Sequence, residues 1–313
     1  NIEYFSGELL NRSLIQSELN RNGYCLFRDT NYHKNIMNDS SSEMAIHTLK
    51  KCILGDNYDE HSIGYESGTD DRTKFRDSLL NVSVTSSSLY IPFHNELFYT
   101  DVFPRILTFI CIIPPQTGGQ TLLSNCVSVW REMSESLREK FVSHKLKYIQ
   151  NLSSSQNAYN KDKKTWQTRF GTEEKAEVER LCETQYQYEY EWWMDARNGN
   201  EEVLRVMYNK PAVIAFEQKK DGRTAEEIRS FANGLFGLHG KYFDTGYDDF
   251  YEAVPMVERP HHCQWENGEE LDVHEVLEIE ELLQRNSMCF DWAAGDILVI
   301  DNLQWAHGRN PFE

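Results

Sequence analysis

The segment His94-Asn95-Glu96, together with a histidine far downstream at His307, restricts the fold of this chain more than any other feature. In an extended strand, residues i and i+2 point to the same face, so His94 and Glu96 can bind one metal ion while Asn95 points away. Two imidazoles and one carboxylate form the facial triad that holds non-haem Fe(II) and leaves its other positions open. If His307 completes this set, two segments distant in the sequence must lie side by side.

The His-x-Glu pattern alone is weak evidence. With 10 His and 50 acidic residues among 313, roughly one or two such matches are expected by chance, and an isolated match more often marks an ordinary buried histidine. Three further patterns that follow in one order along the chain make a chance match of His-x-Glu less plausible. They are a Pro-Pro-Gln-Thr-Gly-Gly-Gln-Thr segment at 114–121, Gly-Asp-Ile-Leu-Val-Ile-Asp-Asn at 295–302 and His-Gly-Arg-Asn-Pro-Phe at 307–312.

The pattern of apolar residues predicts a mainly β protein with flanking helices. Strands are expected at 24–27, 79–85, 89–99, 105–113, 120–123, 145–150, 203–208, 212–216, 288–292 and 296–301, with 203–208 paired to 212–216. Helices are expected at 6–21, 44–54, 127–142, 172–182, 224–236 and 272–285, the last two after capping boxes. Because no repeat or linker is visible, we expect a single domain over 1–313, with helical and loop insertions at roughly 124–290.

Composition excludes several classes of function. The net charge is −18 and no basic cluster occurs, which argues against nucleic acid and anionic membranes as partners. No apolar run reaches the roughly 18 residues of a membrane helix, and the first residues do not resemble a signal peptide. Seven scattered Cys without a CxxC pattern predict free thiols in a reducing, cytoplasmic environment. The segment His261-His262-Cys263 lacks ligand spacing and is expected to be a solvated loop.

The ordered motifs resemble the Fe(II)/2-oxoglutarate dioxygenases of the taurine-dioxygenase-like (TauD/TfdA) superfamily. The nearest branch carries HxE and acts on amino acids and specialised metabolites. The segments 23–28, 65–72 and 85–87 share this resemblance. It implies a double-stranded β-helix (jelly-roll, cupin-like) core, with His94, Glu96 and His307 as the iron ligands. It also implies Fe(II), 2-oxoglutarate and O2 as cofactors.

The resemblance further implies how the cosubstrate is bound. Thr121 matches the position whose hydroxyl contacts the distal carboxylate of 2-oxoglutarate, and a buried carboxylate requires such donors. The family's carboxylate-binding Arg lies ten or more residues beyond the distal His, which here falls past Glu313. Arg309 is an alternative within the sequence, although it sits nearer the metal ligand than the family's Arg.

The implied reaction oxidises an unactivated C–H of a small polar, amino-acid-derived molecule and releases succinate and CO2. Hydroxylation, desaturation and oxidative cyclisation all stay open, whereas Glu96 argues against halogenation, since halogenases of this superfamily lack the carboxylate. Two other functions also stay open: a non-catalytic β-helix binding protein and a protein side-chain hydroxylase. The oligomeric state cannot be read from the sequence.

Candidate substrate residues are the polar and aromatic side chains that lie near the motifs in the sequence. Arginine binds carboxylates bidentately, which favours Arg72 and Arg169, although a structural role is as good an interpretation for each. We also expect a lid over the pocket at about 151–169. The full set is Tyr65, Arg72, Ser87, Tyr99, Trp166, Arg169 and Trp305.

Overall fold

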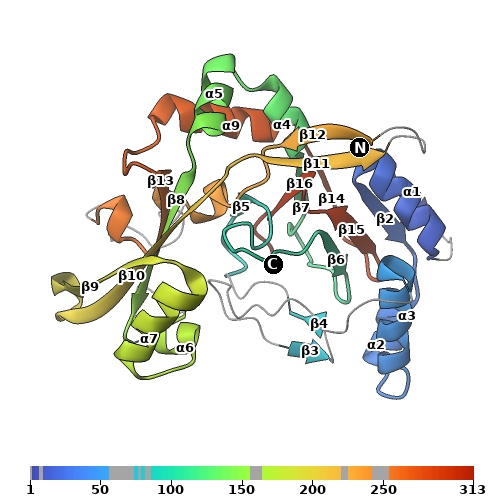
Figure 1. Cartoon of the computed structure of the whole chain (residues 1–313). Helices are drawn as coiled ribbons and strands as arrows, with labels where there is room; N and C mark the ends of the chain where they lie inside the picture. Colours follow the sequence, from blue (N-terminus) through green and yellow to red (C-terminus); the bar gives the residue numbers. More distant parts are fainter. Residues whose placement is uncertain are drawn as a thin grey trace.

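The computed structural model describes residues 2–6, 10–55, 74–76, 79–81, 86–155, 164–219, 225–241 and 254–313. Within these ranges the protein is mainly antiparallel β-sheet with flanking helices, as predicted (Figure 1). Sheet I has the order β1-β2-β15-β6, and sheet II has the order β14-β7-β16-β5. Their strands are β1 (Phe5–Ser6), β2 (Tyr24–Arg28), β15 (Ile297–Asp301), β6 (Ile106–Ile110), β14 (Ser287–Phe290), β7 (Thr121–Asn125), β16 (Trp305–Arg309) and β5 (Ile91–His94).

Sheets I and II pack against each other through one apolar cluster. Leu26, Leu298 and Ile300 of sheet I contact Leu123 and Trp305 of sheet II. Side chains alternate along a strand, so the neighbouring residues of β15 point to the opposite face, towards the helices outside sheet I. Burial on both faces explains why β15 reads as an uninterrupted apolar run rather than an alternating one.

The helices outside sheet I are α1 (Arg12–Asn22), α2 (Tyr32–Met37) and α3 (Ser42–Leu54). The side chain of Asn11 caps α1 by accepting a hydrogen bond from the N–H of Leu14. Gly23 ends the helix with φ 73°, and a Cβ there would lie 2.6 Å from Nε1 of Trp305. The glycine therefore permits both the left-handed turn and the close approach of β16.

The opposite face of sheet II is covered by α4 (Cys126–Glu132) and α9 (Val273–Arg285), with α5 (Glu135–Ser143) and α8 (Leu235–Leu238) in the same core. The capping box at the start of α9 is confirmed: Asp272 and Glu275 exchange side-chain and backbone hydrogen bonds. The helix predicted at 127–142 is two helices, because the chain turns out of α4 at Met133.

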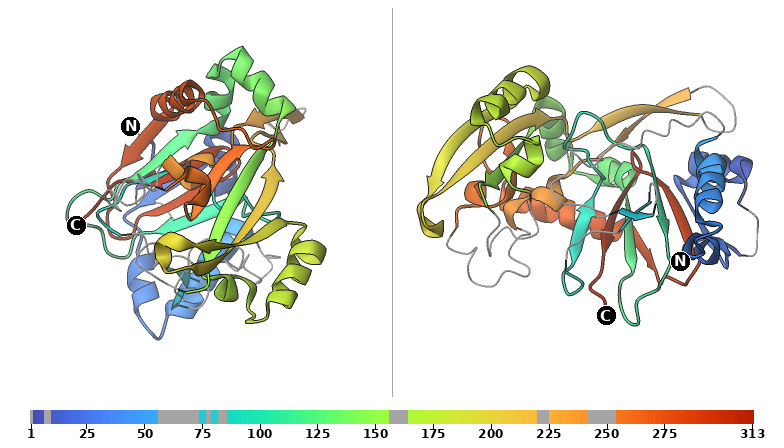
Figure 2. Two further views of the ribbon diagram at one scale, coloured as in Figure 1. Left: turned by 90° about the vertical axis from the view of Figure 1, so that its left-hand side faces the viewer. Right: turned by 90° about the horizontal axis from the view of Figure 1, so that it is seen from below.

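Sheet III, with the order β13-β8-β10-β9, lies to one side of the other two (Figures 1 and 2). Trp166 and Phe170 of α6 and Val178 of α7 pack against this sheet. Its strands are β13 (His261–Trp265), β8 (Leu146–Ser153), β10 (Glu201–Lys210) and β9 (Glu189–Asp195). The remaining elements are α6 (Trp166–Phe170), α7 (Lys175–Leu181), the π-helical turn Cys182–Tyr186, the 3-10 turns Ala196–Asn198 and Met256–Glu258, and two hairpins, β11 (Ile214–Lys219) with β12 (Ala225–Ser230) and β3 (Lys74–Arg76) with β4 (Leu79–Leu80).

Three further sequence predictions are wrong, in strand pairing, element type or burial. The segment 203–208 does not pair with 212–216, since β10 lies between β8 and β9 while β11 pairs with β12. The helix expected at 224–236 is strand β12 over Ala225–Ser230, followed by the single turn α8; Thr224 itself lies outside the described residues. Pairing with β11, which buries Ile228, outweighs the helical preference of Ala225, Glu226 and Glu227.

The third error concerns His261-His262-Cys263, expected in a solvated loop. These residues belong to β13, in which every residue is buried. The strand pairs with β8 and packs through Cys263 into the main core. In addition, all seven Cys are free thiols, and no helix in the described ranges is long and apolar enough to cross a bilayer.

Candidate metal centre

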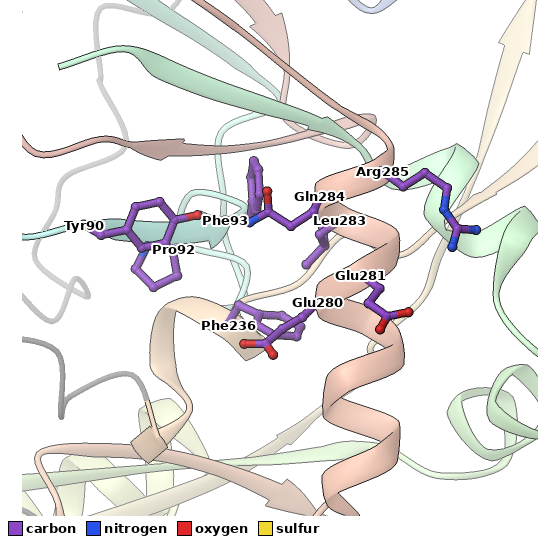
Figure 3. Close-up of a pocket in the computed structure, with 9 residues that line it drawn as sticks. All are labelled: Tyr90, Pro92, Phe93, Phe236, Glu280, Glu281, Leu283, Gln284 and Arg285. Carbon is purple, nitrogen blue, oxygen red and sulfur yellow. The ribbon is translucent and has the colours of Figure 1, made fainter. Parts of the chain in front are cut away.

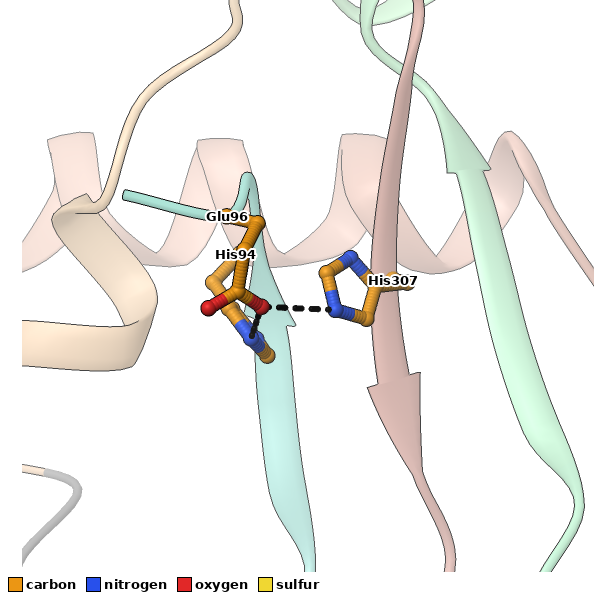
Figure 4. Close-up of side chains that lie close together, drawn as sticks. All are labelled: His94, Glu96 and His307. Carbon is orange, nitrogen blue, oxygen red and sulfur yellow. Dashed lines mark ion pairs between the residues drawn. The ribbon is translucent and has the colours of Figure 1, made fainter. Parts of the chain in front are cut away.

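The pairing of β16 with β5 brings the two predicted histidines together. His307 lies directly opposite His94 in the antiparallel register, and the ring centroids are 4.3 Å apart. Oε2 of Glu96 lies 3.8 Å from Nε2 of His94 and 3.5 Å from Nε2 of His307 (Figure 4). Three side chains from two distant segments therefore converge on one point.

The two carboxylate–imidazole separations fit a single first-row metal ion, and the donor atoms of all three side chains lie within 4.8 Å of one another. Such an ion bonds to nitrogen and oxygen at about 2.0–2.2 Å, so two donors on one ion lie at most about 4.4 Å apart. Both carboxylate–imidazole separations fall below that limit. Nδ1 of His94 lies 2.9 Å from the carbonyl oxygen of Pro92. That contact places the ring hydrogen on Nδ1, so the lone pair of Nε2 can bind a metal ion.

Glu96 reaches this point by a different route from the one expected. The strand β5 ends at His94, and Glu96 is the first residue of a turn in which Leu97 adopts φ 58°. The alternation of a strand therefore does not set the direction of the Glu96 carboxylate. Asn95 does point away from the two imidazoles: its side-chain amide donates to the carbonyl oxygens of Asn302 and Trp305.

The two predicted cosubstrate residues lie on the same face of sheet II as His307. Arg309 is directly opposite Thr121, two residues along from the pair His307–Leu123. Nε1–H of Trp292 donates to the Thr121 hydroxyl at 3.0 Å. The Arg309 guanidinium donates to the carbonyls of Ser86 (2.8 Å) and Leu89 (3.3 Å) and lies over the ring of Phe312. Burial lowers the pKa of Arg309 from its ordinary value.

The predicted substrate residues are dispersed. Trp305 points to the same face as His307, but its Nε1–H donates to the carbonyl of Asn22 at 2.8 Å. Tyr99 is buried in the main core cluster, near Gly234. Trp166 and Arg169 are on α6, beside sheet III.

Among the described residues, Ser87 has no hydrogen bond or ion pair with the candidate metal ligands. Ser87 is exposed, and its carbonyl accepts a hydrogen bond from the N–H of Phe312. Tyr65, Arg72 and part of the expected lid (156–163) lie outside the described residues.

A pocket of about 590 Å³ lies between β5 and α9 rather than at the three converging side chains (Figure 3). Its apolar side consists of Pro92, Phe93, Phe236 and Leu283. Figure 4 shows α9 behind the strands that carry His94 and His307, whose side chains project in front. The pocket and the candidate metal centre are therefore distinct features. Tyr90, Glu280, Glu281, Gln284 and Arg285 complete the pocket lining.

A second group of potential ligands comprises His239, His262 and Glu270. Backbone N–H groups donate to Nδ1 of both rings, from Gly240 to His262 and from Lys241 to His239. Each neutral ring therefore carries its hydrogen on Nε2, and Nε2 of His262 donates to Glu270 at 2.9 Å. This pattern favours a buried hydrogen-bonded pair over a metal site.

The buried His239 is expected to make stability depend on pH. Burial, His262, Lys241 and Arg259 together lower the pKa of His239 from 6.5 to about 3. The unfolded chain therefore binds the proton first, so this stabilisation is complete above pH 6.5 and is lost as the pH falls towards 3. At pH 5 the loss is on the order of 2 kcal/mol. Urea unfolding at pH 5 and above pH 6.5 measures the free energy of unfolding of wild type and of His239→Gln. This free energy should change less with pH in the variant than in wild type. An equal change in both proteins would contradict the expectation.

Two imidazoles and one carboxylate that meet at one point are typical of the iron site of non-haem Fe(II) oxygenases. The family described as taurine catabolism dioxygenase TauD, TfdA matches residues 6–313, and the chain belongs to this family. The protein is therefore a 2-oxoglutarate-dependent non-haem iron dioxygenase, with Fe(II), 2-oxoglutarate and O2 as its cofactors.

Individual relatives are distant. The dapdiamide synthesis protein DdaC of Enterobacter agglomerans is 23% identical over 81% of this chain and 71% of its own length. The clavaminate synthase-like protein At3g21360 of Arabidopsis thaliana is 23% identical over 80% of this chain and 69% of its own length. Among solved structures, the PvcB protein of Pseudomonas aeruginosa is 12% identical with a TM-score of 0.47, covering 100% of this chain and 83% of PvcB.

Proposed function

We propose that His94, Glu96 and His307 bind Fe(II), and that the enzyme oxidises an unactivated C–H of a small polar, amino-acid-derived metabolite. The observation that carries the proposal is the convergence of the three side chains, with the Glu96 carboxylate within 3.8 Å of both imidazoles. The names of two relatives support the substrate class: one is a dapdiamide synthesis protein, and the other is a clavaminate synthase-like protein. Bound iron supplies O2 activation coupled to the oxidative decarboxylation of 2-oxoglutarate.

The proposed scaffold is a double-stranded β-helix, or jelly-roll, formed by sheets I and II within one domain over residues 1–313. Its support is the shared apolar core of the two sheets and the chain path, in which β7 and β14 pair although residues 126–286 separate them. Sheet III, α4 to α9 and the β11–β12 hairpin are then insertions between the two ligand-bearing segments. Such an arrangement places the metal site at the inner face of sheet II.

Thr121 and Arg309 are proposed to bind the cosubstrate carboxylate. The Thr121 hydroxyl accepts a hydrogen bond from Trp292, so its own hydrogen can be donated to a carboxylate oxygen. Arg309 is beside it on the same face of sheet II, and a partly desolvated guanidinium interacts strongly with an anion. Arg309 must then direct one of its remaining N–H groups to the ligand, because Nη2 already donates to Ser86 and Leu89.

The reaction can be tested with purified, Fe(II)-loaded protein, 2-oxoglutarate and a panel of amino acids and their derivatives under air. We expect succinate to form in amounts that match a substrate product. Gain of one oxygen atom indicates hydroxylation, and loss of two hydrogens indicates desaturation or cyclisation. A chelator-treated sample is the control and should form no succinate. If the iron-loaded protein forms no succinate with any compound and does not bind 2-oxoglutarate in calorimetry, the proposed function is wrong.

A further inference from the structure

The side chain of Asn302 contacts the backbone of Glu96 at both its ends. Oδ1 of Asn302 accepts from the Glu96 N–H at 2.9 Å, and Nδ2 of Asn302 donates to the Glu96 carbonyl at 3.0 Å. One amide thus makes the two hydrogen bonds that a neighbouring strand would make with a paired residue. Glu96 itself lies beyond the end of β5, which ends at His94.

This contact occurs where the chain turns sharply. Leu97, directly after Glu96, is a buried non-glycine residue with φ 58°, a conformation that costs energy and persists only where the surrounding structure holds it. The direction of the Glu96 side chain depends on the backbone torsions of this turn. The two hydrogen bonds from Asn302 to the Glu96 peptide groups therefore fix the direction of the Glu96 carboxylate.

Asn302 is itself held rigidly. It is fully buried (0% exposed), and its backbone N–H donates to the carbonyl of Arg105 at 2.7 Å. Its carbonyl accepts from the Asn95 side chain at 2.7 Å, and its Nδ2 also donates to the carbonyl of Pro104 at 2.8 Å. Two carbonyls face Nδ2 and one N–H faces Oδ1, so only one orientation of the amide satisfies every partner.

We propose that Asn302 is a positioning residue for the metal site: it sets the Glu96 carboxylate in the geometry that the two imidazoles share. The inference rests on the proposed role of Glu96 as an iron ligand. In this proposal Asn302 is not itself a ligand of the ion, and it acts through its hydrogen bonds to the backbone of Glu96. Its effect should therefore be seen in metal binding itself, without any turnover.

The test uses Co(II) titrated into the metal-free full chain, followed by calorimetry and by the visible d–d spectrum, which reports coordination geometry. Asn302→Ala should weaken Co(II) binding by about 10- to 100-fold, the range for residues that orient metal ligands. The spectrum of its cobalt complex should move towards that of Glu96→Ala. Asn302→Asp should bind at least as weakly as the alanine variant, because a carboxylate accepts from the Glu96 N–H but repels the carbonyls of Glu96 and Pro104.

Asn151→Ala is the matched control. The Asn151 side chain donates to the carbonyls of Val257 and Arg259 and accepts from Arg205, all outside the candidate metal centre. Its replacement removes a similar number of hydrogen bonds and should leave the cobalt affinity and spectrum unchanged.

The two proposals fail in different ways. A wild-type protein that does not bind Co(II) would contradict the proposed function. Wild-type binding, together with unchanged affinity and spectrum in Asn302→Ala, would overturn the positioning role alone. If Asn302→Ala does not fold, the isosteric Asn302→Asp and the smaller Asn302→Ser decide the question by the same two readouts, with circular dichroism confirming the fold of each variant.

Discussion

Replacing Glu96 by alanine is expected to abolish Fe(II)-dependent succinate formation and to weaken metal binding by more than about 100-fold. The carboxylate lies 3.8 Å from one imidazole and 3.5 Å from the other, so its removal leaves two of the three proposed donors. Residues that merely orient metal ligands already contribute about 10- to 100-fold to affinity, and a direct ligand contributes more. Calorimetric titration with Mn(II) or Co(II) and a succinate assay measure the two effects separately.

A matched control for this variant is Glu281→Ala. Glu281 is an exposed carboxylate on α9 that lines the separate pocket, and its removal changes the net charge by the same amount. Metal affinity and succinate formation should stay at wild-type levels in this control. Wild-type metal affinity in Glu96→Ala would show that the ion, if bound, is held elsewhere, and the assignment of the three ligands would be wrong.

Replacing Leu298 by alanine is expected to lower the free energy of unfolding by about 2–5 kcal/mol. Leu298 is fully buried on β15, in the cluster where sheets I and II meet, together with Leu26 and Leu123. Truncation removes apolar contact from both sheets and leaves a cavity that close-packed neighbours cannot fill. Urea denaturation followed by circular dichroism measures the change.

The corresponding control is Val102→Ala, since Val102 is 65% exposed and should change stability by no more than about 0.5 kcal/mol. If Leu298→Ala were as mild as this control, the face-to-face packing of sheets I and II would not be a main source of stability. The metal affinity of folded Leu298→Ala should stay near that of wild type, because the three candidate ligands belong to β5, the turn after it and β16, whereas Leu298 belongs to β15 of the other sheet.

Local signals in the sequence predicted many elements well. The glycine after α1, the capping box of α9 and the apolar run of β15 each depend on residues close together in the chain. Such signals are reliable because capping, left-handed turns and side-chain alternation are properties of a few neighbouring residues.

The errors arose where distant pairing decided the outcome. The segment from Ala225 reads as a helix, but it forms β12 because β11 lies beside it. The segment with His262 lacks metal-ligand spacing and is expected in a solvated loop, yet β13 pairs with β8 and buries it. Strands are predicted near both partners, at 212–216 and 145–150, but which strand pairs with which cannot be read from the local sequence, since many strands of similar composition compete.

The sequence by itself determined which donors this protein offers: His94 and Glu96 two residues apart, a second imidazole at His307, and motifs in an order that indicates the dioxygenase family. Only the tertiary structure decided how those donors meet. The register of β16 against β5 places one ring opposite the other, and Asn302 holds Glu96 in a turn that strand periodicity does not describe. Residue types are local, whereas the direction of a buried carboxylate depends on hydrogen bonds from residues remote in the chain.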